Sequence, residues 1–298
     1  MRGSILESGS DSFSALGTPA WASSGRGSLR RLIRSPSGRV GIVLTAVLVA
    51  LGCVGGWVAP GDPFASVGPT LGPPSLTFPL GTDDLGRDVL AGVAHGTRTS
   101  LALAVMVSAL AGLIGIGVGA LAGWNGGWVD DALMHITEFV QVVPRFFLAV
   151  IVIALFGPGL DRVVLLLALT SWPWVARVVR AEVLSLKAWD FVEAARSQGA
   201  SSSRVLLRQV LPNALPPVVV VVSLNAAGVI LIEAGLSFLG LGDPDVISLG
   251  YLANNAQRFL RVAWWMAVFP GATIAVAVLG LNLLGDGFNE ALNRRGAP

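Results

Sequence analysis

Long apolar runs separated by short polar segments dominate the chain. An α-helix rises about 1.5 Å per residue, so about 20 apolar residues cross the roughly 30 Å hydrocarbon core of a bilayer. Pro144 and Pro173 interrupt two of the runs, but membrane helices tolerate proline where neighbouring helices satisfy the freed carbonyls. The pattern predicts an all-α membrane protein with about six transmembrane helices, and five or seven remain open. The six runs are 40–59, 100–123, 139–156, 163–179, 216–236 and 262–284.

The segments between these runs divide the chain further. Residues 1–38 are rich in Ser, Gly and Arg and predict a disordered basic tail. A first transmembrane anchor is expected at 39–60, and its length and the long preceding tail disfavour a cleaved signal peptide. A loop is expected at 61–97, whose first part is too rich in Pro and Gly for regular structure. A core of about five transmembrane helices follows at 98–290, with a polar loop at 186–213 inside it, before a tail at 291–298.

The cationic residues lie mostly on one side of the predicted membrane. The opposite side carries only Arg87, Arg98, Arg162, Arg258 and Arg261. The positive-inside bias therefore predicts that both termini and the polar loop face the cytoplasm. The cytoplasmic set is Arg2, Arg26, Arg30, Arg31, Arg34, Arg39, Arg177, Arg180, Lys187, Arg196, Arg204, Arg208, Arg294 and Arg295.

Composition excludes several classes of function. Hydrophobic residues make up 53% of the chain and charged residues 13%, whereas soluble domains carry about a quarter charged residues. The net charge of +2 gives no reason to expect a nucleic-acid partner. Cys53 is the only cysteine, so an internal disulfide framework or a cysteine metal cluster is not expected. His95 and His135 are far apart in the sequence, and we expect no metal or cofactor site.

The polar loop carries the signals of two short helices. Asp190 followed by Glu193 has the spacing of a capping box at a helix start. Gly199 can adopt the left-handed conformation that ends a helix and turns the chain. Apolar positions then recur through 204–211, and Pro212 is predicted to end this second helix. The prediction is a helix–glycine–helix elbow, a rigid protrusion suited to docking into a groove of a partner.

The elbow resembles the EAA loop of ABC-importer permeases, in which two alanines follow a glutamate, a glycine comes four residues after the second alanine, and Leu-Pro follows about eleven residues later. Gln209 departs from the aliphatic residue that the family favours two positions before Leu-Pro. An interfacial amphipathic helix without a partner is the simpler alternative. The matching residues, which would couple the permease to an ATPase, are Glu193, Ala194, Ala195, Gly199, Leu211 and Pro212.

Three further stretches resemble the second permease of dipeptide, oligopeptide and nickel importers. They are PLGTDDLGRD at 79–88, EAGLSFLGLG at 233–242, and FPG at 269–271 with NLLGDG at 282–287. Together they extend over most of 79–292 in the family's order. The family often continues after the second stretch with a Pro-rich Ser-Trp-Gly segment, which DPDVISLG at 243–250 replaces here. That difference bears on the substrate and on the binding-protein contact.

The resemblance implies a type I ABC-importer permease fold with a cytoplasmic coupling helix, in the inner membrane of a bacterial cell. It also implies a second homologous permease chain, two cytoplasmic ABC ATPases and an extracytoplasmic substrate-binding protein as partners. Lys187, the only lysine, lacks the glycine-rich context of a phosphate-binding loop, so ATP hydrolysis is expected in the partner chains and the chain itself is not expected to be an enzyme. Di- or oligopeptides are the implied substrates, with nickel or another small solute as the alternative.

A different class, the ion-coupled secondary carrier, is the main rival. Such carriers often have inverted repeats and ionisable residues near the bilayer midplane. This chain has no evident internal repeat and its midplane segments are nearly free of charge. An intramembrane enzyme would need a paired nucleophile and base or a metal cluster within the spans, which the sequence does not offer.

Polar residues within the spans could line a substrate pathway or could stabilise the packing of the helices. Intramembrane charge is costly and often marks a pathway or a pair. Small residues at every fourth position, 111, 115, 119 and 123, predict close helix packing. The candidates for the pathway or gate are Glu138, Gln141, Arg145, Asn225 and Glu233, of which Asn225 could bond another helix and Glu233 could hold the next loop.

Overall fold

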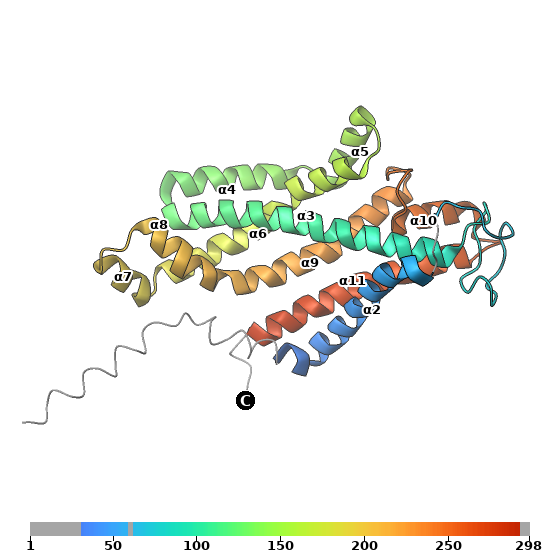
Figure 1. Cartoon of the computed structure of the whole chain (residues 1–298). Coiled ribbons are helices and arrows are strands. Elements are labelled where there is room, and N and C mark those ends of the chain that lie inside the picture. The colour runs from blue at the N-terminus through green and yellow to red at the C-terminus, as the bar shows by residue number, and fades with distance from the viewer. Residues whose placement is uncertain (1–30, 59–61, 293–298) are drawn as a thin grey trace, which may run out of the picture.

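The computed structural model describes residues 31–58 and 62–292, and every regular element in these ranges is a helix (Figure 1). The helices form an elongated bundle. One end carries α7 and α8, and we call it the elbow end; the opposite end carries residues 62–88 and α10, and we call it the loop end. The elements are α2 (Pro36–Val58), α3 (Val89–Asn125), α4 (Gly127–Val142), α5 (Arg145–Phe156), α6 (Leu160–Lys187), α7 (Asp190–Ser197), α8 (Ser202–Val205), the π-helical η2 (Leu206–Val210), α9 (Leu211–Phe238), α10 (Leu249–Ala256), the 3₁₀-helical η3 (Gln257–Phe259) and α11 (Trp265–Leu292).

Five of these helices are long and apolar enough to cross a bilayer, and α4 with α5 makes a sixth crossing if the pair is one span. The predicted continuous span at 139–156 is wrong, because α4 and α5 are bent by 74° at residues 143–144. Pro144 sets this break, since proline disfavours helical geometry at the preceding residue and Val143 is extended, with ψ 120°. Pro173, by contrast, lies inside the continuous α6.

The first predicted boundaries also shift. The anchor begins at Pro36, and residues 31–34 are already helical, although the tail was expected to be disordered up to 38; residues 1–30 and 293–298 lie outside the described ranges. The loop predicted at 61–97 ends at Asp88, because the Asp88 carboxylate accepts a hydrogen bond from the Leu90 N–H at 2.9 Å and caps α3. Capping here starts α3 about two and a half turns before residue 98.

Both described ends of the chain lie together on the elbow side of the bundle, set back from α7 and α8 (Figure 1). The Arg31 guanidinium donates to the carbonyl of Ala291 at 3.3 Å, next to where α11 ends. Ends on one side of the bundle require an even number of crossings, which is met if α4 and α5 form one span. That this side faces the cytoplasm stays a prediction.

The predicted ridge of small residues is the contact between α3 and α6. Gly115, Gly119 and Gly123 lie against α6, and a Cβ added at Gly119 would be 2.8 Å from the Cβ of Val179 and closer still to the carbonyl oxygen of Ala176. Backbones can approach this closely only where side chains are absent. The small residues therefore set the distance between α3 and α6.

Replacing Gly119 by Ala is expected to force α3 and α6 apart. Overpacking of this kind lowers the free energy of unfolding by about 1–3 kcal/mol. Gly117→Ala is the matched control on the same helix, because a Cβ there would have no atom within 4 Å. Thermal unfolding of both variants in detergent measures the difference. Equal melting temperatures would mean that α3 and α6 can separate without cost.

At the loop end, residues 62–88 form turns without regular strands, as the Pro and Gly content predicted. The Trp265 indole N–H donates to the carbonyl of Thr82 at 3.1 Å, and the hydroxyl of Thr82 bonds the carbonyl of Pro69 at 2.5 Å. Asp243 accepts from the Leu160 N–H at 3.1 Å and so caps α6 from the α9–α10 loop. These bonds hold the irregular loops against the helix ends.

Candidate functional site: the elbow and its anchor

The elbow consists of α7, the turn at Gly199 and α8. Gly199 has φ 79°, and its N–H donates to the Arg196 carbonyl at 2.9 Å, while the Ala200 N–H donates to the Ala195 carbonyl at 3.1 Å. This pair of bonds is the Schellman motif, which ends a helix with a left-handed residue. The predicted role of Gly199 is confirmed. The predicted capping box is wrong: Trp189 is the N-cap, without a side-chain bond, and Asp190 is the first helical residue.

The second helix of the elbow, α8, is the N-terminal part of a long transmembrane helix. The prediction that Pro212 ends a short helix is wrong, because α8, η2 and α9 form one continuous helix, Ser202–Phe238. Pro212 lacks an N–H and its ring clashes with the carbonyl four residues earlier. The preceding π-turn accommodates this, with the Leu211 N–H bonding the Leu206 carbonyl five residues back. Any displacement of α8 therefore passes directly into α9.

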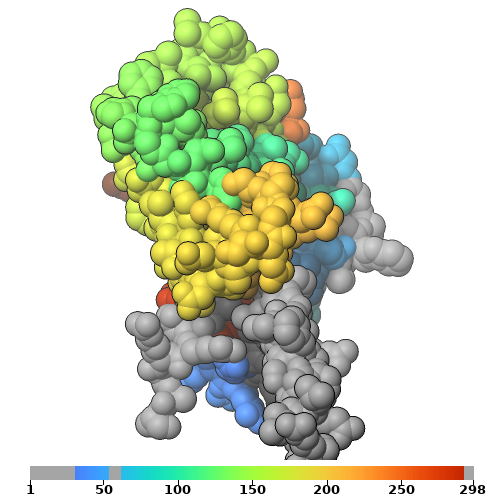
Figure 2. Space-filling view, turned by 90° about the vertical axis from the view of Figure 1, so that its left-hand side faces the viewer, coloured from blue at the N-terminus to red at the C-terminus, as the bar shows by residue number. Residues whose placement is uncertain are grey.

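The residues of the EAA-like motif divide between an outer and an inner face. Glu193, Ala194 and Gly199 are exposed, Ala195 is 8% exposed, and Leu211 and Pro212 are half-buried in the first turn of α9. Val192 and Ala195 seat α7 on the core formed by α3, α6 and η2. Figure 2 shows the elbow in the middle of this end of the molecule, free of other described segments. Such a surface, with Trp189 57% exposed beside it, suits contact with another protein.

A cluster around Trp124 anchors the elbow to the bundle. Trp124 lies in the last turn of α3 and is 8% exposed. Its indole N–H donates to the Ser202 hydroxyl at 3.1 Å, and its carbonyl accepts from Lys187 Nζ at 2.6 Å. The Arg196 guanidinium carbon lies 4.9 Å from the ring centroid and Lys187 Nζ 5.7 Å, within the range of cation–π attraction. We call Trp124, Lys187, Arg196 and Ser202 the Trp124 clasp; it joins α3, α6, α7 and α8.

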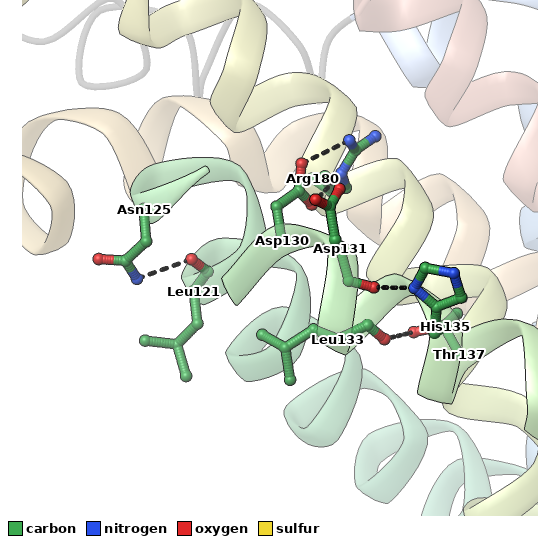
Figure 3. Close-up of polar contacts among 8 residues, drawn as sticks. All are labelled: Leu121, Asn125, Asp130, Asp131, Leu133, His135, Thr137 and Arg180. Atoms are coloured by element: carbon green, nitrogen blue, oxygen red, sulfur yellow. Dashed lines mark hydrogen bonds and ion pairs between the residues drawn. The ribbon is translucent and has the colours of Figure 1, made fainter. Parts of the chain in front are cut away.

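A second tie holds α4 to α6 at the same end. Arg180 binds Asp130 through Nε at 2.5 Å and through an NH2 nitrogen at 2.6 Å, so the contact is bidentate (Figure 3). Figure 3 also shows Asn125, His135 and Thr137 bonding carbonyls one turn back on their own helices, so they make no tie to α6. Among the described residues this is the one ion pair within 4 Å. Paired Arg and carboxylate planes fix orientation as well as distance.

Neither the clasp nor the ion pair was predicted from the sequence. Trp124, Lys187 and Ser202 are separated by 63 and 15 residues, and no spacing rule connects such distant positions. Arg180 entered the sequence analysis only as one of the cationic residues assigned to the cytoplasmic side, and it lies within α6. The one available hint was Trp124 itself, the only Trp, Tyr or Phe residue in α3.

Removing either partner of the ion pair is expected to destabilise the bundle more than removing both. Asp130 is largely buried, and a buried charge left without its partner costs more than a neutral pair of similar size. In a double-mutant cycle with Asp130→Asn and Arg180→Gln, we expect a coupling free energy of about 1–3 kcal/mol from thermal or denaturant unfolding. Additive single effects would show that the contact does not stabilise the fold.

The predicted polar residues of the spans are not gathered into one site. Glu138 and Gln141 lie in α4 before the bend, and Arg145 begins α5 after it. Asn225 donates to the Ser108 hydroxyl at 3.3 Å and so bonds α9 to α3, as expected for a helix-bridging amide. Their part in a pathway stays a prediction.

Glu233 is 2% exposed and belongs to a closed network. It accepts from the Ser237 hydroxyl at 2.7 Å and the Ser100 hydroxyl at 3.4 Å, while Ser100 accepts from the Leu249 N–H at 3.3 Å. Buried carboxyl groups persist where hydrogen bonds satisfy them. The geometry favours the second of the two predicted roles, in which Glu233 holds the loop before α10.

Residues 115–297, which include the elbow, match the family described as binding-protein-dependent transport system inner membrane component. The chain belongs to this permease family. Curated relatives agree over most of its length. The permease is 36% identical to the di/tripeptide transport system permease protein of Pseudomonas aeruginosa over 85% of this chain and 86% of the relative. It is 33% identical to the dipeptide transport system permease protein of Bacillus subtilis, over 89% and 83%.

A third relative is the glutathione transport system permease protein of Pectobacterium atrosepticum, 39% identical over 74% of the permease and 73% of that protein. Among solved structures, a chain of the MetNI methionine ABC transporter in inward-facing conformations superposes with a TM-score of 0.55. The superposition covers 68% of the permease and 97% of the MetNI chain, and the two sequences are 20% identical. The predicted fold, that of a type I ABC-importer permease, is confirmed.

Proposed function

We propose that this permease is one of two homologous pore-forming subunits of an ATP-driven importer that moves di- or oligopeptides into the cell. Three of the relatives carry di/tripeptide, dipeptide or glutathione transport in their names, and glutathione is itself a peptide. The further partners would be two cytoplasmic ABC ATPases, which bind and hydrolyse the ATP, and an extracytoplasmic binding protein that delivers substrate. The permease would carry out no covalent chemistry of its own and would need no cofactor.

The observation that carries the proposal is the exposed elbow whose second arm continues as α9. In the proposed orientation the elbow end and both chain termini face the cytoplasm, in agreement with the distribution of arginines. ATP-driven closure of the two ATPases would push α7, and the continuous Ser202–Phe238 helix would carry the displacement to the loop end. Its 37 residues span about 55 Å, longer than the membrane is thick.

The Trp124 clasp gives this movement a second route. Because Trp124 is the end of α3, a displaced elbow would also pull α3, and α3 packs along α6 through its glycine ridge. The helices α3, α6 and α9 would then rock as a unit while the cavity between the two permeases opens on one side and closes on the other. Movement of packed elements between two arrangements is the usual basis of such switching.

The test is transport by the complete complex in proteoliposomes. We expect ATP-dependent uptake of radiolabelled di- and tripeptides that requires the binding protein, with no uptake of nickel ions under the same conditions. Nickel uptake without peptide uptake would refute the peptide assignment but leave the importer mechanism in place. Purification in mild detergent distinguishes an importer from an ion-coupled carrier, because only an importer subunit co-purifies with ATPase chains.

A further inference from the structure

A groove opens on the side of the bundle at the loop end, where α3 and α6 meet the α9–α10 loop. Its volume is about 740 Å³, within the range of about 300–1,000 Å³ typical of small-molecule sites. Its rim is formed by His95, Arg98, Thr99 and Asp161, and its apolar wall includes Met106 and Leu165. The groove follows α3 from His95 to Leu110, about 22 Å along the helix axis, so it descends from the polar surface into the outer half of the predicted span.

The rim carries one charge of each sign, and neither is neutralised. Arg98 and Asp161 are exposed, and within the described ranges neither has an ion-pair or hydrogen-bond partner for its side chain. The Nε2 atom of His95 is buried and also lacks a partner there. Two opposite charges without partners on one rim can pair with a ligand that carries both signs.

The wall below the rim has the opposite character. Met106 is 53% exposed and Leu165 57% exposed, both toward the groove. Methionine fits irregular partners because its side chain is unbranched and flexible. The groove thus offers a positive group, a negative group and an adaptable apolar surface, which complement a small molecule with an ammonium, a carboxylate and variable side chains.

We propose that this groove is a peptide-binding subsite of the permease, in which Arg98 pairs with the α-carboxylate and Asp161 with the α-ammonium group. Met106 and Leu165 contact the peptide side chains without selecting among them. The assignment deepens the proposed function and depends on it. It gives the permease its own affinity for zwitterionic peptides after the binding protein releases them.

Thiol protection tests occupancy of the groove. In a Cys53→Ser background, Met106→Cys places a thiol in the groove wall, and Val105→Cys places one on the adjacent, 67% exposed position that does not line it. In the complete importer in nanodiscs, we expect a water-soluble maleimide to modify Cys at 106 and increasing trialanine to protect it saturably. Trialanine should leave modification at 105 unchanged. Equal protection at both positions, or none at 106, would overturn the proposal.

The charged rim is tested with Arg98→Gln and Asp161→Asn, and with Arg261→Gln as a control for a cationic residue at the loop end outside the groove. Loss of one charge-assisted contact is expected to raise the trialanine concentration for half-protection about tenfold in each rim variant and not in the control. Trialanine amide should bind wild type about as weakly as trialanine binds Arg98→Gln. Unchanged protection in the rim variants would refute the assignment of Arg98 and Asp161.

Other occupants give different results. Protection without peptide that depends on phosphatidylethanolamine in the nanodisc would assign the groove to a zwitterionic lipid headgroup. Protection in the assembled complex with neither peptide nor that lipid would assign it to the second permease, and both outcomes reject the subsite. Peptide uptake by wild-type proteoliposomes is measured in parallel: if uptake occurs and protection does not, only the subsite fails, whereas absence of uptake refutes the proposed function.

Discussion

Charge reversal at Glu193 is expected to reduce peptide uptake at least tenfold while leaving the fold of the permease intact. Glu193 is exposed on α7, and no side chain in the described part of the chain binds it, so its replacement by Lys removes no internal contact. A like-charge contact in a protein interface costs several kcal/mol, enough to displace a docked partner. Uptake and ATP turnover of the complex in proteoliposomes are measured together, and we expect ATP turnover that no longer drives uptake.

The matched control is Glu290→Lys, an exposed charge reversal near the end of α11, which lies outside the elbow. Gly199 provides a second comparison. Gly199→Pro cannot adopt the observed φ of 79° and should uncouple uptake in the same way, whereas Gly199→Asn tolerates this conformation and should keep most of it. Normal uptake in Glu193→Lys and Gly199→Pro would exclude the elbow as the coupling element.

Truncating Trp124 to Ala is expected to have the largest effect on stability. The side chain is 8% exposed and holds four elements, so its loss leaves a cavity and frees Lys187 and Arg196 from the ring. Substitutions of this kind cost about 3–5 kcal/mol of unfolding free energy in protein cores. Thermal unfolding should therefore shift clearly, and the remaining folded complex should hydrolyse ATP with little uptake.

Two milder variants distinguish the contribution of ring packing from that of hydrogen bonding in the Trp124 clasp. Trp124→Phe keeps an aromatic face for the cations but loses the N–H to Ser202, and Ser202→Ala removes the other partner of that bond. Both should be folded and partly coupled, with similar losses of uptake. Trp174→Ala is the control, because Trp174 is 56% exposed on α6 and lies outside the clasp. If Trp124→Ala lowers stability without changing the ratio of uptake to ATP turnover, the clasp is structural and does not transmit movement.

The two ends of the molecule are connected by α9. The N-terminal end of α9 continues from α8, the second helix of the elbow. Near its C-terminal end, Glu233 lies in the hydrogen-bonded network with Ser100 and Ser237. The groove proposed for peptides lies on another face of α3 from this network, beside the α9–α10 loop that contains Asp243. A displacement of α9 would therefore reach the loop end through bonded contacts to α3 and α10 and need not travel through flexible loops.

The sequence by itself determined five of the six apolar segments long enough to cross the membrane, and where the chain turns at the elbow. Both follow from local requirements: a bilayer of given thickness needs about 20 apolar residues, and a left-handed helix end needs a residue such as Gly199. The ridge at Gly115 and Gly119 was also readable, because residues four apart share a helix face. The family motif around Glu193 added the coupling hypothesis.

Only the tertiary structure decided how these helices are joined. The 74° bend at Pro144 and the continuity past Pro212 are opposite outcomes of the same residue type, and the surrounding packing selects between them. The Trp124 clasp, the Asp130–Arg180 pair and the groove each combine residues that lie far apart in the chain. Their meeting depends on the rotation and crossing of packed helices, which no local pattern of apolar and polar residues specifies.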